Sequence, residues 1–97
     1  MLKTKELAHN HLISQLEGNI VSDMDGETVM LSVHNGKYYN LGAIGGVIWE
    51  LIKDSISIEE LITTLQSQYD VEQTECEEQV HSFLDQLLEE GLIKIEA

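Results

Sequence analysis

The stretch "DGETVMLSVHNGKYYNL", residues 25–41, places two turn signals around one alternating segment. In "ETVMLSVH", Val29, Leu31 and Val33 fall on one face and Thr28, Met30 and Ser32 on the other, which is the period of a half-buried strand. The DG and NG dipeptides beside such a segment are strong hairpin signals. With "NIVSD" before them and "KYYNL" after them, the sequence predicts a three-stranded antiparallel sheet over residues 19–41.

From residue 43 the apolar residues recur with the period of an α-helix. Ser57 and Thr74 are expected to cap the second and third helices, because each is followed three residues later by Glu. Gly91 is expected to end the third helix. The terminal "LIKIEA" either adds a short strand or trails along the core. The predicted fold class is α+β and winged helix-turn-helix-like, with the sheet followed by helices over residues 43–53, 58–68 and 73–90.

The length of 97 residues suits one domain with a modest core. Residues 1–17 are polar and weakly patterned, so they are expected to form an N-terminal extension of uncertain order before a domain over residues 18–97. No apolar run approaches the roughly 18–20 residues that cross a bilayer. The start also lacks the apolar core of a signal peptide. A cytoplasmic location is therefore expected.

Charge excludes whole classes of partner. The chain has 5 basic and 18 acidic residues, a net charge of −13. The third predicted helix, which would enter the DNA major groove in a winged-helix DNA reader, contains no Lys or Arg. Nucleic acids and anionic membranes both need basic residues for binding, so neither is expected as a partner. A neutral or basic peptide segment would be attracted instead.

The candidate reactive and metal-binding residues favour structural roles. Cys76 is the single cysteine and lies near a helix N-terminus, but Glu75 and Glu77 beside it oppose a thiolate, so it is expected to be a small buried apolar residue. His9 and His11 are spaced as a weak metal pair without an evident third ligand. No convergent carboxylate pair is visible. The chain is therefore expected to have no catalytic residue, no metal site and no cofactor.

Two features of the first helix also favour packing over binding. "GAIGG", residues 42–46, lacks the GK[ST] ending of a phosphate loop, so its glycines are expected to let the first helix pack closely on the sheet. Trp49 lies off the apolar stripe of that helix and is expected to pack in the core, with a binding surface as the alternative.

Two longer stretches carry a family resemblance. "NGKYYNLGAIGGVIWELI" (35–52) and "SIEELITTLQSQYDVEQTECEEQVHSFLDQLLEEGLI" (57–93) resemble the PqqD-like family, the small winged-helix domains called RiPP recognition elements. The shared features are G-x-Y-Y-x-L, I-W-E-L, (I/V)-E-E-L and V-x-x-F-L-x-x-L-x-x-x-G-L, and the resemblance covers about residues 18–93. The chain departs from the family at Gly42, where Asn is frequent, and at Gln79, where Asp is common.

The resemblance implies a non-catalytic protein that binds the leader of a ribosomally made precursor peptide and presents it to modifying enzymes. A free-standing domain of this length is similar to those of lasso-peptide pathways. The implied partners are then a cysteine protease that removes the leader and an ATP-dependent macrolactam synthetase. A general protein–protein adaptor is the alternative, and a transcription regulator is a weaker one.

The expected binding site combines a strand edge with the third helix. An incoming peptide strand can pair with the edge of residues 37–41, and apolar residues of the helix then supply sequence preference. The apolar residues of that helix spread over about 140° of its circumference, and pattern alone leaves open which serve the core and which the site. A free edge also leaves room for a homodimer. The predicted peptide-binding residues are Lys37, Tyr38, Tyr39, Asn40, Leu41, Cys76, Gln79, Val80, Phe83, Leu84 and Leu87.

Overall fold

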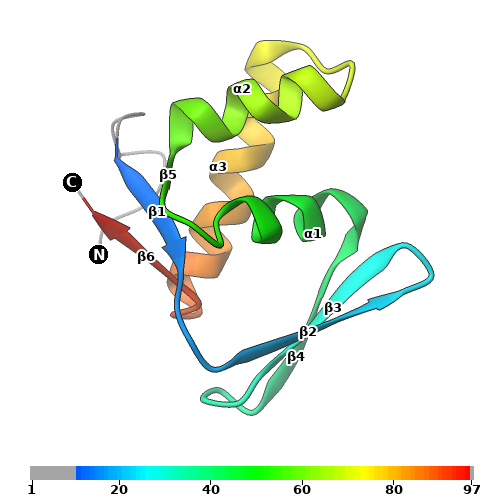
Figure 1. Cartoon of the computed structure of the whole chain (residues 1–97), viewed down its shortest axis with the longest axis vertical. Helices are drawn as coiled ribbons and strands as arrows, with labels where there is room; N and C mark the ends of the chain where they lie inside the picture. Colours follow the sequence, from blue (N-terminus) through cyan, green and yellow to red (C-terminus); the bar gives the residue numbers. More distant parts are fainter. Residues whose placement is uncertain (1–10, 97) are drawn as a thin grey trace.

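The computed structural model describes residues 11–96, in which two small antiparallel sheets pack with three helices (Figure 1). One sheet has the order β2-β3-β4, with strands Asn19–Met24, Glu27–Ser32 and Lys37–Leu41. The other has the order β5-β1-β6, with strands Ile56–Ser57, Leu12–Gln15 and Ile93–Glu96. The helices are α1 (Gly42–Leu51), α2 (Ile58–Gln68) and α3 (Gln73–Glu89). The predicted α+β class is confirmed.

The β2-β3-β4 sheet is the meander that the turn signals predict. Asp25 and Gly26 both have positive φ, 56° and 84°, and join Met24 to its partner Glu27 in a two-residue turn. Gly36 also has positive φ in the second turn, and its N–H donates to the Ser32 carbonyl at 2.8 Å. Local turn chemistry therefore sets the register of all three strands.

The second sheet was not predicted. β1 lies inside the stretch 1–17 for which the sequence assigned no element, and Ile13 on it is fully buried between the partners Ile56 and Ile95. Residues 12–15 therefore belong to the folded core, whereas residues 1–10 lie outside the described part of the chain. The final segment forms β6, the first of the two alternatives for "LIKIEA".

One of the two predicted N-terminal helix caps is correct. Ser57 caps α2, because its Oγ accepts the Glu60 N–H at 3.0 Å. The cap expected at Thr74 is wrong: α3 begins at Gln73, and the Glu72 carbonyl accepts the Cys76 N–H at 2.9 Å. The chain reaches Glu72 in an extended conformation and turns there, so Thr74 falls inside the first helical turn.

Gly91 ends α3 as predicted. Its φ is +74°, and its N–H donates to the Leu88 carbonyl at 3.1 Å while the Leu92 N–H donates to the Leu87 carbonyl at 2.9 Å. This pair of bonds is the Schellman arrangement. It turns the chain directly from α3 into β6, which holds the C-terminal end of α3 in place.

α1 packs closely on the β2-β3-β4 sheet at Gly46, one of the glycines for which this role was expected. A methyl group on Gly46 would lie 2.7 Å from the Thr28 Cβ of β3, closer than real contacts allow. Trp49 is buried in the core with Ile48 and Ile52, so the packing interpretation of Trp49 is correct. No helix within residues 11–96 is long and apolar enough to cross a membrane.

Candidate functional site

β4 has one unpaired edge. Its other edge is bonded to β3, and no strand of residues 11–96 pairs with it on the free side. Between β4 and α3 lies a groove of about 490 Å³. Its walls are residues 37–41 of β4 on one side and, on the other, Phe83, Gln86, Leu87, Glu89, Glu90 and Leu92. We call this space the groove.

The side chains of β4 alternate between the two faces of its sheet. Tyr39 and Leu41 are half-buried and pack against the core, whereas Tyr38 is 75% exposed. Asn40 is exposed as well; its Nδ2 donates to Glu27 Oε1 at 3.0 Å and its Oδ1 accepts the Gly42 N–H at 2.9 Å. β4 is therefore held along one edge by β3 and on one face by the core, against which Tyr39 and Leu41 pack. Its other edge stays accessible.

A polar cluster joins β4 and the β3–β4 turn to the end of α3. The Tyr39 hydroxyl donates to Glu90 Oε1 at 2.6 Å, and Asn35 Nδ2 donates both to the Tyr39 hydroxyl at 3.1 Å and to the Glu90 carbonyl at 2.8 Å. Lys37 Nζ lies 3.7 Å from the same Glu90 oxygen. These bonds tie the β3–β4 turn to the end of α3 and so fix the width of the groove there.

The same cluster shifts two pKa values in opposite directions. The hydrogen bond from Tyr39, followed by the charge of Lys37, lowers the pKa of Glu90. The hydrogen bond to Glu90, followed by burial, raises the pKa of Tyr39. At neutral pH Glu90 is therefore a carboxylate and Tyr39 a neutral donor, which is the combination that the 2.6 Å bond requires.

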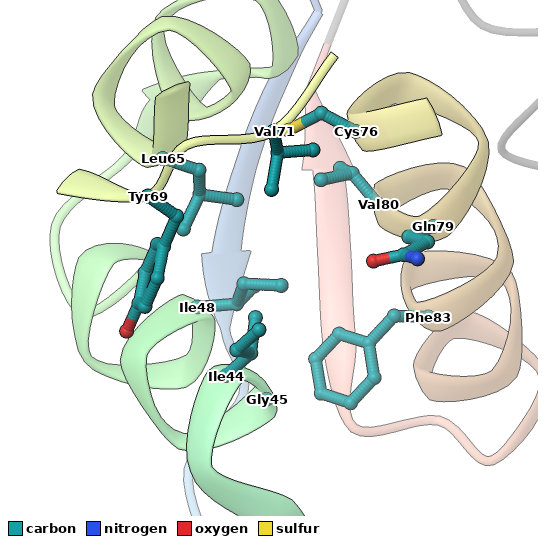
Figure 2. Close-up of a pocket in the computed structure, with 10 residues that line it drawn as sticks. All are labelled: Ile44, Gly45, Ile48, Leu65, Tyr69, Val71, Cys76, Gln79, Val80 and Phe83. Atoms are coloured by element: carbon teal, nitrogen blue, oxygen red, sulfur yellow. The ribbon is translucent and has the colours of Figure 1, made fainter. Parts of the chain in front are cut away.

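A second hollow lies farther along α3, between α3 and α1. Its volume is about 180 Å³, and its walls come from three parts of the chain (Figure 2). α1 supplies Ile44, Gly45 and Ile48, the end of α2 and the segment after it supply Leu65, Tyr69 and Val71, and α3 supplies Cys76, Gln79, Val80 and Phe83. All but Gly45, Tyr69 and Gln79 are apolar or thiol side chains. We call this space the pocket.

The structure sorts the predicted residues of α3 into different positions. Cys76, Gln79 and Val80 line the pocket, Leu87 lines the groove, and Phe83 lines both. Leu84 is fully buried in the core and lines neither space. The predicted residues of β4 all line the groove. The peptide-binding role of the whole set stays a prediction.

Several lining residues carry no signal in the sequence. Gln86 and Glu89 on α3 and Glu90 at its C-cap are polar positions, which look like an ordinary solvated face. Ile44 and Gly45 belong to a helix whose apolar stripe equally suits the core. Gln86 lies three residues after Phe83 on the same helix face, so helical spacing from Phe83 would have found it once α3 was known to border a groove.

Cys76 has the environment of a structural thiol. It is buried, and burial, followed by the negative charge of Glu77, raises the pKa of the thiol. It therefore stays protonated and is a poor nucleophile at neutral pH. Within residues 11–96, no three His, Cys, Asp or Glu side chains gather as metal ligands would. His9, half of the weak metal pair, lies outside these residues.

Comparisons with known proteins bear on the family and the fold of the chain. The family model described as coenzyme PQQ synthesis protein D (PqqD) matches residues 27–93. The solved structure of TbiB1 in complex with the TbiA(beta) leader peptide is 26% identical in sequence, covers 84% of this chain and 94% of its own, and superposes with a TM-score of 0.74.

A lasso peptide synthetase B1 complexed with the leader peptide is 24% identical, covers 84% of this chain and 96% of its own, and has a TM-score of 0.72. At that identity the second likeness supports the fold alone. No curated protein sequence matches the chain.

Proposed function

Because the chain belongs to the PqqD family, we propose that it is a RiPP recognition element that binds the leader of a ribosomally made precursor peptide. The observation that carries the proposal is the free edge of β4 beside the groove. TbiB1, which shares this fold at 26% identity, was solved with a leader peptide bound. The leader would add to the sheet as a further strand next to residues 37–41.

Strand addition gives affinity without much sequence preference, because every peptide offers the same backbone groups. The pocket can supply the preference. Its volume of about 180 Å³ is close to that of an engineered cavity of about 150 Å³ that binds benzene. One aliphatic or phenyl-sized side chain of the leader would therefore fill it.

Charge supports a basic or neutral leader. Glu89 and Glu90 border the groove, and Lys37, its one cation among the described residues, lies beside Glu90. The protein as a whole carries a net charge of −13. We therefore propose that the chain acts in the cytoplasm as a non-catalytic carrier, which attracts the leader by charge and holds it by strand pairing.

A separate surface suits the enzymes that receive the leader. On the outer face of the β2-β3-β4 sheet, the paired residues Ile20, Leu31 and Tyr38 form an apolar row across all three strands. Ile20 is 57% exposed, and Met24 and Val33 are exposed nearby. An uncovered apolar patch of this kind marks a protein interaction site.

Ile20 and Leu31 do not line the groove, so their part of this surface stays accessible while the groove is filled, whereas Tyr38 borders both. We propose that it docks the modifying enzymes of a lasso-type pathway, a cysteine protease and an ATP-dependent macrolactam synthetase.

Amide exchange tests the strand addition. The probe is a peptide enriched by the immobilised protein from a display library of random 12-residue peptides, here called the selected peptide. When it is added, alternate amides of residues 37–41 should gain protection, because their free N–H groups acquire partners. Amides of β2, the other edge strand, serve as the internal control. Protection confined to β2 or to the outer face of α3, or the absence of any enriched peptide, would contradict the proposal.

Ile20→Asp tests the docking surface. The variant should bind the selected peptide as the wild type does, and should lower the rate at which the cysteine protease of the pathway cleaves the leader by about fivefold, because a carboxylate replaces an apolar contact. Val21→Asp is the matched control: it lies on the same strand, on the opposite face. Equal rates for the wild type and Ile20→Asp would remove the outer face as the docking surface.

A further inference from the structure

Phe83 of α3 lies directly against the backbone of α1. A methyl group placed on Gly45 would lie 3.0 Å from Phe83 Cε1 and 3.1 Å from Phe83 Cζ, and 3.2 Å from the Leu41 Cβ. These distances are tighter than nearly all real methyl contacts, so the ring takes up the space that any other residue at position 45 would fill. The Phe83 ring therefore packs directly on Gly45.

The Phe83 ring separates the pocket from the groove. Phe83 lines both the pocket and the groove. In Figure 2 it extends from α3 toward Ile44 and Gly45 of α1 and forms one wall of the pocket. The groove continues on the other side of the ring, where Leu41 ends β4.

We propose that Phe83 is the specificity-determining residue of the site, because its ring sets the size of the pocket and keeps the anchor side chain apart from the strand-paired segment. The inference rests on the proposed function, since it concerns which peptides the site accepts. A peptide paired with β4 reaches the pocket only beyond Leu41. Its anchor residue therefore lies outside the paired segment, and its side chain meets a wall at Phe83.

Removal of the ring joins the pocket of about 180 Å³ to the groove of about 490 Å³. A small anchor side chain then loses its contacts with the ring, because the empty space that replaces the ring offers no dispersion attraction. A larger anchor, such as Trp, gains the space that the wild type denies it. Hydrophobic pockets discriminate side chains by about tenfold or more for each step in size.

The experiment selects peptides from the same random 12-residue library on four immobilised proteins: the wild type, Phe83→Ala, Phe83→Leu and Leu88→Ala. Leu88→Ala is the matched control, because Leu88 is also a half-buried apolar residue of α3 that packs on the core but lines neither space. Thermal unfolding confirms that each variant is folded, and Phe83→Leu serves if Phe83→Ala does not fold. The readout is the residue distribution at the most strongly selected apolar position.

The wild type and Leu88→Ala should select aliphatic or phenyl-sized residues. For Phe83→Ala the ratio of Trp to Leu at that position should rise by about tenfold, with a smaller rise for Phe83→Leu. The same distribution for the wild type and both folded Phe83 variants would overturn this inference alone. A wild type that enriches no peptide would overturn the proposed function, and the inference with it.

Discussion

Ile44→Asp is expected to weaken binding of the selected peptide by about thirtyfold while the protein stays folded. Ile44 is 43% exposed and lines the pocket, so its carboxylate replacement would be hydrated in the free protein. When an apolar anchor enters, that carboxylate loses water without gaining a partner. The cost of burying an unpaired polar group is about 2 kcal/mol in mutational data, which corresponds to roughly thirtyfold in affinity.

Fluorescence anisotropy with the labelled selected peptide measures the affinity, and thermal unfolding checks the fold. Met24→Asp is the control for the added negative charge, because Met24 is equally an exposed apolar residue but lies at the far hairpin, outside the pocket and the groove. If both variants lose affinity to the same extent, the loss comes from overall charge and the pocket is not the anchor site.

The helical pattern alone would have chosen Val80 for this test. The structure shows why that choice fails: Val80 is 2% exposed and belongs to the core cluster as well as the pocket. An Asp at position 80 would be buried in the free protein, so the fold and the site would be lost together. Ile44→Asp separates loss of peptide binding from loss of the fold, because Ile44 lines the pocket at its solvent-exposed side.

The parts of the fold that the sequence predicts are those encoded by neighbouring residues. Asp25–Gly26 and Asn35–Gly36 set two turns, and Ser57 and Gly91 set two helix ends, each through bonds that span only a few positions. β1 could not be found in this way. Its four residues show no long alternation, and its partners at residues 56–57 and 93–96 are distant in the chain.

The candidate site divides along the same line. The edge of β4 follows from strand order, so residues 37–41 could be predicted as groove residues. The pocket depends on how closely α1 approaches α3, which no pattern within either helix records. Gly45 illustrates this. The side chain that would crowd any larger residue at position 45 belongs to Phe83, which lies 38 positions away in the sequence but in contact in the fold.

Gly46→Ala is expected to destabilise the protein by about 2 kcal/mol, against the usual trend for this change. In the middle of a helix, Ala is normally more stable than Gly by roughly 0.5–1 kcal/mol. Here the new methyl group would lie 2.7 Å from the Thr28 Cβ and overlap the Thr28 Oγ1. Thr28 sits on a strand paired on both sides, so it cannot move away, and overpacking of this kind costs about 1–3 kcal/mol.

Gly45→Ala is the matched comparison, because it adds one methyl group to the same helix. Its nearest neighbours are two atoms at the far end of the Phe83 ring, at 3.0 and 3.1 Å, and the Leu41 Cβ at 3.2 Å. Because a shift of a few tenths of an ångström relieves these contacts, we expect a smaller loss of unfolding free energy than for Gly46→Ala. Denaturant unfolding measures both variants. Thr28→Ala combined with Gly46→Ala should recover part of the loss, since it removes the nearer of the two Thr28 contacts.

If Gly46→Ala is as stable as the wild type, the approach of α1 to β3 is not fixed at this glycine. If it is destabilised as expected, it should also weaken binding of the selected peptide at temperatures where it is fully folded. The reason is that α1 carries Ile44 and Gly45 into the pocket, so a helix displaced from the sheet changes the position of the wall that faces Phe83.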